Sequence, residues 1–167
     1  MAVEPCEIPE TASLRRYRDP GAYVDCYVVE VAGSVSHAAF VEAFYTTWLF
    51  KVERAILTAF VSRPSTDLDA KQLAEGRVET FAAWRVEDRM PGQLLLGDYT
   101  GRTKSWLMVA PAGDGTSLYF GSAVVPKVDS TTGERKLGFV FGALLGFHKL
   151  YSRLLLGSAR SRIRASR

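Results

Sequence analysis

Between residues 78 and 125, turn-forming residues recur at short and even intervals, and this spacing constrains the fold more than any other feature of the sequence. Pro91-Gly92 and Gly113-Asp114-Gly115 are typical of tight turns, since proline presets one backbone dihedral and glycine accepts a positive one. Thr100-Gly101 marks a third turn. Between the turns the side chains alternate in hydropathy with a period of two, as in β-strands. We predict an antiparallel meander with strands at residues 78–88, 93–99, 102–110 and 116–125.

The segments on either side of the meander have other periods. Residues 22–32 alternate aromatic and β-branched side chains, which predicts one further strand, ended by Gly33. Apolar residues then recur at every fourth position from Phe40 to Phe60, which predicts a long amphipathic helix with room for one break. A short helix over residues 67–75 follows, ended by Gly76. From Lys136 onward, helical spacing returns and predicts a long closing helix.

A strand, a helical insertion, a meander and a closing helix make an α+β order, and we predict one domain over residues 1–167. Packing both helical stripes on one sheet face is the simplest way to bury them. The opposite face then needs cover from the N-terminal arm, from sheet curvature or from a second subunit. The arm, residues 1–20, is expected to be peripheral because it mixes prolines with charges. The side chains assigned to that opposite face are Phe81, Trp106, Met108 and Tyr119.

Several short segments resemble a bacterial family of unknown function in the SRPBCC superfamily, which includes START lipid-transfer domains, polyketide cyclases and the birch-pollen allergen. The resemblance covers roughly residues 78 to 156 and implies a helix-grip (START-like) fold. In that fold a curved antiparallel sheet wraps around the C-terminal helix and leaves an apolar cavity between them. The superfamily has no universal catalytic motif to carry over. The segments that carry the resemblance are Trp84-Arg85-Val86, Pro91-Gly92-Gln93-Leu94-Leu95-Leu96, Ser105-Trp106-Leu107, Thr116 to Phe120, and Phe147-His148 followed by Tyr151.

Glycines at every fourth position of the closing helix, Gly138, Gly142 and Gly146, leave one helix face without side chains. This face either makes room for a ligand beneath the sheet or packs closely against it, and both interpretations turn it inward. Aromatic side chains of the meander either line a cavity or form its core. The pocket candidates of this kind are Trp84, Tyr99, Trp106 and Tyr119.

Two titratable residues interrupt apolar segments and are further pocket candidates. His148 lies in an apolar turn of the closing helix and is interpreted either as a buried, hydrogen-bonded side chain or as a proton-transfer group. Asp25 interrupts the first strand, and a buried carboxylate there needs a partner such as an arginine or a tyrosine hydroxyl. It either ties the strand to a neighbouring loop or orients a ligand. Glu53 is interpreted as a solvated helix edge or as pocket lining, and His37 as a surface residue.

Several classes of site and partner are not expected. The two histidines, with no acidic pair at ligand spacing, predict no metal site, and no nucleotide-binding, hydrolase or zinc-protease motif predicts a cofactor. The net charge of +3 is too small to imply a nucleic-acid partner, and the arginines of the basic tail, residues 158–167, lack interleaved aromatics. His148, Lys149 and Arg153 interrupt the apolar run 137–156, so we expect no membrane span. Without a secretory leader, a cytoplasmic location with Cys6 and Cys26 as free thiols is expected.

Three hypotheses for function remain open at this point. The first is a non-covalent binding module that holds a small hydrophobic or aromatic molecule between the sheet and the closing helix. The second is a cyclase-like or hydratase-like enzyme acting on such a molecule, with His148 or Asp25 handling the proton. The third is a structural or partner-binding domain that forms a homodimer through the uncovered sheet face. The sequence alone leaves the ligand unidentified and the question of catalysis open.

Overall fold

The computed structural model describes residues 2–19, 21–61, 64–128, 135–136 and 139–166. Its helices are the 3-10 helix η1 (Ser13–Tyr17) and the α-helices α1 (His37–Tyr45), α2 (Trp48–Val61), α3 (Asp67–Ala74) and α4 (Phe139–Ala165). Its strands are β1 (Glu4–Pro5), β2 (Tyr23–Ala32), β3 (Thr80–Phe81), β4 (Trp84–Met90), β5 (Gln93–Asp98), β6 (Thr103–Ala112), β7 (Gly115–Val124), β8 (Lys127–Val128) and β9 (Arg135–Lys136).

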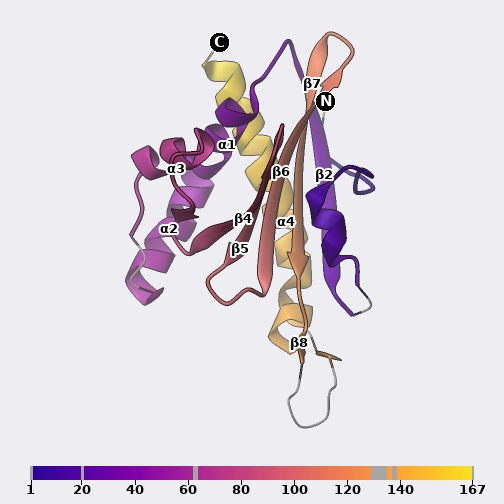
Figure 1. The fold of residues 1–167 in the computed structure, drawn as a ribbon, viewed down its shortest axis with the longest axis vertical. Helices are drawn as coiled ribbons and strands as arrows, with labels where there is room; N and C mark the ends of the chain where they lie inside the picture. The colour runs from indigo at the N-terminus through magenta and orange to yellow at the C-terminus, as the bar shows by residue number, and fades with distance from the viewer. Residues whose placement is uncertain (1, 20, 62–63, 129–134, 137–138, 167) are drawn as a thin grey trace.

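Among the described residues, seven strands form one antiparallel sheet in the order β1-β2-β7-β6-β5-β4-β3. β3 to β7 are consecutive along the chain and form the predicted meander. β2 pairs with β7 over its whole length, from Tyr23 opposite Val124 to Ala32 opposite Gly115. The first long strand therefore joins the last one, and α1 to α3 are inserted between them in the sequence. This arrangement is the predicted α+β class (Figure 1).

The predicted strand 78–88 is in fact two strands. β3 and β4 are joined at Ala82, whose backbone φ is +51°. Positive φ is normally signalled by glycine, so nothing in the pattern marked a turn at an alanine. The other predicted strands agree with the structure to within two residues at each end. The short strands β1, β8 and β9 escaped prediction because two residues carry no measurable period.

The predicted long helix is broken once, at Thr46 and Thr47, which separate α1 from α2. The Thr46 hydroxyl donates to the Glu42 carbonyl at 2.7 Å, and the Thr47 hydroxyl accepts from the Phe50 amide at 3.2 Å. These bonds satisfy backbone groups that a helix end leaves free, so the chain turns here at little cost. Trp48 consequently leaves the apolar stripe and is exposed. The short helix α3 ends before Gly76, which has the predicted left-handed backbone.

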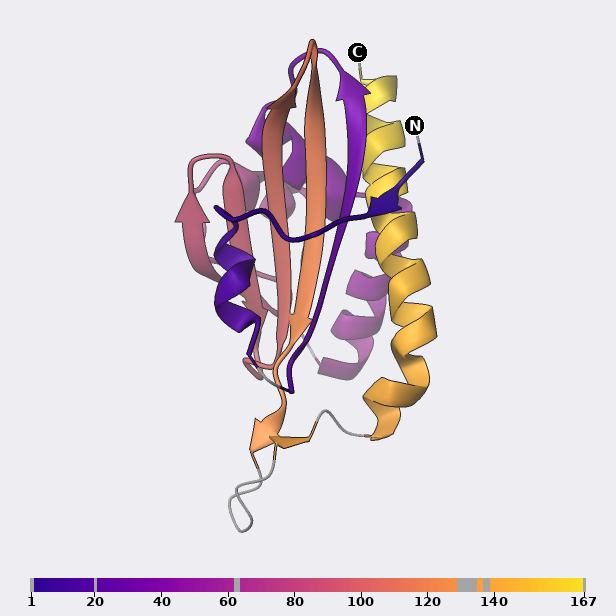
Figure 2. The same ribbon diagram turned by 90° about the vertical axis from the view of Figure 1, so that its right-hand side faces the viewer.

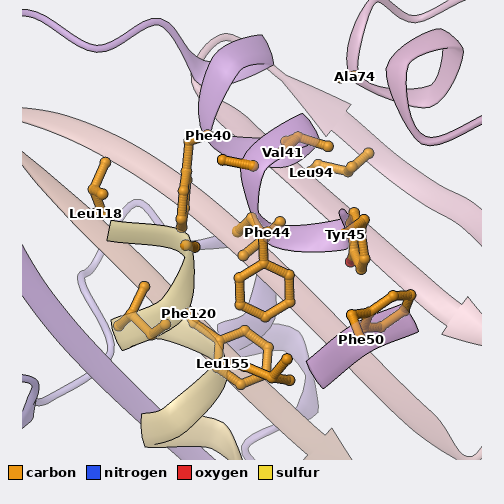
Figure 3. Packing of buried hydrophobic residues seen from close by; sticks show 14 of the residues in the cluster. Phe40, Val41, Phe44, Tyr45, Phe50, Ala74, Leu94, Leu118, Phe120 and Leu155 are labelled. Atoms are coloured by element: carbon orange, nitrogen blue, oxygen red, sulfur yellow. The ribbon is translucent and has the colours of Figure 1, made fainter. Parts of the chain in front are cut away.

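α4 contacts β2, β7, α1 and α2, and so lies along the same face of the sheet as α1. A curved antiparallel sheet that holds a long C-terminal helix in this way is a helix-grip fold, as the views in Figures 1 and 2 show. We call this side the inner face. Its core joins α1, α2 and α4 to the sheet (Figure 3). Phe44 of α1 packs on Phe120 of β7 with ring centroids 4.8 Å apart.

The outer face is covered by the N-terminal arm, which crosses the sheet on the side away from α1 and α2 (Figure 2). Leu14 of η1 and Trp106 of β6 are fully buried in this second core. Gln93 connects the layers, because its side-chain oxygen accepts from the Ser13 amide and from the Trp106 indole. From the sequence, the cover of this face could be the arm, sheet curvature or a second subunit. In the structure it is the arm. Phe81, assigned to that face from the sequence, lies instead in the inner core.

Further contacts hold the arm in place. Arg16 forms an ion pair with Asp88, and the sulfur atoms of Cys6 and Cys26 share a hydrogen bond at 3.0 Å, both cysteines being free thiols. The hydrogen bond lowers the pKa of Cys6, while the same bond and burial raise the pKa of Cys26. Within the described part of the chain, no helix has both the length and the hydropathy needed to cross a bilayer.

Candidate functional site

A pocket of about 470 Å³ lies on the inner face, between the sheet, α2 and α4. Its volume falls in the range of small-molecule sites. Among the described side chains of the two helices, four apolar ones are at least half exposed and lie at its edge: Val52, Phe147, Leu150 and Leu154. Buried aromatic and aliphatic residues, several of them drawn in Figure 3, form its interior. They include Phe44, Phe50, Phe120 and Leu155.

The strand register places a row of polar residues across the floor of this apolar pocket. Asp25 of β2 lies opposite Ser122 of β7, and Ser122 lies opposite Ser105 of β6. The next residues along β7 and β6 on the inner face, Phe120 and Leu107, belong to the apolar core. Buried polar groups cost free energy unless they are paired. This row is therefore the part of the inner face that can form hydrogen bonds with a bound molecule.

Asp25 organises one end of the row. Its Oδ1 accepts from the Ser122 hydroxyl at 2.6 Å and from the Ser122 amide at 3.1 Å, and its Oδ2 accepts from the Tyr23 hydroxyl at 2.9 Å. Burial raises the pKa of Tyr23, and the neighbouring Asp25 carboxylate adds to the effect. The sequence-based expectation of a tyrosine hydroxyl as partner for Asp25 agrees with this arrangement.

His148 of α4 reaches the same cluster. Its Nε2 lies 2.8 Å from the Ser122 hydroxyl and 3.5 Å from Asp25 Oδ2, and its ring meets the Tyr23 ring edge-on. Serine, histidine and aspartate are therefore together, but not as in a hydrolase triad. In a triad the imidazole stands between the other two and uses both nitrogens, whereas here one nitrogen meets both partners and serine also bonds the aspartate directly. The geometry is therefore not that of a triad with an activated serine nucleophile.

Glu53 of α2 and Tyr151 of α4 form a second polar group in the pocket wall. The Tyr151 hydroxyl donates to Glu53 Oε2 at 2.5 Å. Burial among apolar side chains raises the pKa of Glu53, and the hydrogen bond from Tyr151 opposes this only in part. Burial is also the largest cause that raises the pKa of Tyr151, followed by the Glu53 charge. A carboxyl with such a pKa, next to a space for a ligand, is able to transfer protons or to bind charge.

The raised pKa of Glu53 predicts a specific pH dependence of stability. Folded protein keeps this proton at pH values where unfolded protein loses it, so the contribution of Glu53 to stability falls as pH rises above its ordinary pKa of 4.5. Glu53→Gln removes that loss. In urea titrations, the midpoint of the variant relative to wild type is expected to rise from pH 4 toward pH 7. A difference that is constant with pH would contradict the burial of the carboxyl.

Within the described part of the chain, two buried donors of the pocket have no hydrogen-bond partner. They are the Trp84 indole Nε1 and the Ser152 hydroxyl, the latter in a residue only 1% exposed. Both residues line the pocket. Most buried polar groups in native proteins are paired, so each exception calls for an explanation, and a bound molecule with an acceptor atom is one.

The structure brings together some of the predicted site residues and separates others. Trp84 and His148 line the pocket, and Asp25 binds to its floor through Ser122. Trp106 and Tyr119 lie in the outer-face cluster, because strand alternation turns them away from α4. Tyr99 lies past the end of β5 and is 60% exposed.

The predicted glycine groove was a misinterpretation at Gly146. This residue is exposed, and a methyl group placed on it would meet no atom of the described residues within 4 Å, so it does not face inward. Gly142 belongs to α4, but the surroundings of residues 139–145 lie outside the described part of the structure, as does Gly138. His37, expected at the surface, is half-buried, with Nε2 3.3 Å from the Leu107 carbonyl.

Sequence reasoning missed Ser122, Tyr151 and Ser152 as site residues. Serine in a strand and tyrosine in a helix are common and give no local signal. Ser122 and Tyr151 belong to the site because they bond to residues that are distant in the sequence. Ser122, for example, meets Asp25 at a separation of 97 residues. Within the described residues, no group of three or more histidine, cysteine, aspartate and glutamate side chains could hold a metal ion.

No family model matches the chain, and no curated protein matches it by sequence. Among solved structures, the crystal structure of CalU16 from Micromonospora echinospora is similar over 99% of this chain and 96% of that chain. The sequence identity is 15% and the TM-score is 0.36. At these values the similarity says nothing about the residues of the pocket.

Proposed function

We propose that this protein binds a small apolar or aromatic molecule in the pocket between the inner sheet face, α2 and α4. The observation that supports this most directly is the pocket's composition: an apolar wall with an exposed apolar edge, interrupted by a few polar groups. Ligand sites are typically lined in this way, with sparse polar groups that orient the bound molecule. We further propose that the chain is a member of the SRPBCC superfamily, as the resemblance of its motifs suggests.

A second candidate function is an enzyme that moves a proton on the same bound molecule. The contact of His148 with Ser122 and Asp25 favours it, because an imidazole held by hydrogen bonds at a pocket wall is placed to pass a proton to or from a bound molecule. Such an enzyme requires His148, whereas a pure binding protein requires only the shape of the pocket. Turnover that survives His148→Gln would exclude this role for His148.

The binding proposal is tested by filling the pocket. Ser152→Leu replaces an unpaired buried hydroxyl with a larger apolar group at the pocket wall. The affinity for the neutral fluorescent probe N-phenyl-1-naphthylamine is expected to fall by about tenfold or more, a loss of at least roughly 1.4 kcal/mol. Probe fluorescence measures the affinity, and a urea titration checks that the variant folds.

The matched control is Ser161→Leu, which makes the same change on an exposed position of the same helix. It should bind the probe as wild type does. Equal losses in both variants, or binding that survives in folded Ser152→Leu protein, would place the probe elsewhere. If the leucine prevents folding, the smaller Ser152→Val tests the same wall. A wild-type protein that binds no apolar probe would refute the proposed function.

A further inference from the structure

The carboxyl of Glu53 lines the largely apolar pocket, and no cation among the described residues pairs with it. Its hydrogen-bond partner among the described residues is the Tyr151 hydroxyl. The nearby basic residues of α2 are engaged elsewhere, since Lys51 and Arg54 both bind Asp67. A carboxylate in such surroundings retains acceptor positions that a bound molecule can fill.

The other charged groups that the structure describes around the pocket already have partners. Lys104 is a lining residue, but its ammonium pairs with Glu87 and lies over the ring of Tyr17 of η1, on the outer face. Asp25 already accepts hydrogen bonds from Tyr23 and Ser122, and His148 lies against it. Glu53 is therefore the acidic group of the pocket with the most acceptor capacity left for a ligand.

Aromatic rings line the same pocket as the Glu53 carboxyl. Phe147 and Tyr151 of α4 stack with centroids 6.0 Å apart, and both line the pocket together with Trp84. The faces of aromatic rings carry negative electrostatic potential and attract cations, most strongly where water is partly excluded. A carboxylate beside aromatic faces is the combination that recognises ammonium groups. The negative charge of the Glu53 carboxylate repels a ligand carboxylate or phosphate. The aromatic rings offer no positive charge that would offset this repulsion.

We propose that Glu53 binds an ammonium group of the ligand, so that the molecule taken up is an apolar or aromatic amine. The ammonium would donate to the Glu53 carboxylate, and the apolar body would occupy the interior near Phe44 and Phe120. This inference rests on the proposed function and names the class of ligand for the same pocket. The raised pKa of Glu53 is consistent with it, because a carboxylate without a neighbouring cation is the less favoured form.

Two isosteric probes test the inference. 1-Naphthylmethylamine and 1-naphthylmethanol share the same aromatic body and differ in an ammonium against a hydroxyl. By isothermal titration at pH 7, the wild-type protein is expected to bind the amine about tenfold more tightly or better, which is within the range of charge-assisted hydrogen bonds. Glu53→Gln should abolish that preference while leaving the affinity for the alcohol within about threefold, since the variant keeps the shape of the side chain.

Glu30→Gln is the matched control, because it removes one carboxylate from an exposed position of β2. It should keep the full preference for the amine, which excludes a general effect of net charge. Equal binding of amine and alcohol by wild type would overturn the ammonium site and leave the proposed function standing. An amine preference that survives in Glu53→Gln would overturn the assignment to Glu53. Failure of both probes to bind would count against the pocket as a ligand site and hence against both proposals.

Discussion

Replacing Trp106 with alanine is expected to lower the free energy of unfolding by about 3–5 kcal/mol, as for other fully buried large aromatic residues. Trp106 is 0% exposed and packs between the sheet and the arm. Its indole donates to Gln93 at 2.9 Å, and Gln93 in turn accepts from Ser13 and donates to the Thr11 carbonyl. The substitution thus leaves a cavity and weakens the network that holds the arm, and urea titration followed by circular dichroism measures the loss.

Tyr99→Ala provides the control for this prediction. Tyr99 was an equal candidate from sequence, but it is 60% exposed, so its truncation should change stability by no more than about 0.5 kcal/mol. The affinity of Tyr99→Ala for N-phenyl-1-naphthylamine should equal that of wild type, because Tyr99 is outside the pocket lining. Comparable stability losses in the two variants would contradict the assignment of Trp106 to a covered outer face.

Asp25→Ala is expected to lower the free energy of unfolding by about 2–4 kcal/mol, since hydrogen bonds to a buried charged acceptor are stronger than neutral ones. The side chain is only 9% exposed and accepts from the Tyr23 hydroxyl and from two groups of Ser122. Its removal leaves these donors without an acceptor at the pocket floor. Urea midpoints at pH 7 give the size of the loss.

The control for this prediction is Asp114→Ala, at an exposed position in the turn between β6 and β7, which should be near neutral. The double variant Asp25→Ala with Ser122→Ala gives a sharper result. Because the two residues share a hydrogen bond, their losses should not add, and the double variant should be more stable than the sum of the single effects predicts. Strict additivity would show that the two side chains act independently.

Stability and binding should therefore separate along the two faces of the sheet. Changes at Trp106 act on the arm and its core, whereas changes at Ser152 and Glu53 act on the pocket. Changes at Asp25 should affect both stability and binding, because Asp25 holds the pocket floor together and contacts His148 through Ser122. A variant series across these positions distinguishes residues that support the fold from residues that contact a ligand.

Local patterns were sufficient for most elements. The period of two after Gly76 and the turn residues predicted β4 to β7. Apolar residues at every fourth position from Phe40 predicted α1 and α2. Both periods depend only on the geometry of neighbouring backbone residues. The break between α1 and α2 was anticipated, but its position at Thr46 depended on capping bonds. The turn at Ala82 was not predictable, since alanine has no preference for positive φ.

The site was predictable only in part, for a different reason. Asp25 and His148 stood out as polar residues in apolar segments, and the structure brings both to Ser122. Trp84 and Trp106 looked equivalent, because alternation separates the two faces of a strand without saying which face a helix covers. That choice follows from the position of the arm and of α4, so Trp84 lines the pocket and Trp106 lies in the outer core.

By itself, the sequence determined the class of fold, the order of its longer elements and the presence of a closing helix, since these follow from short-range periodicity and turn chemistry. Only the tertiary structure decided that β2 pairs with β7, that the arm covers the outer face and that Glu53 meets Tyr151. These contacts join residues that are distant along the chain, and their energies depend on shared burial, which no local pattern encodes.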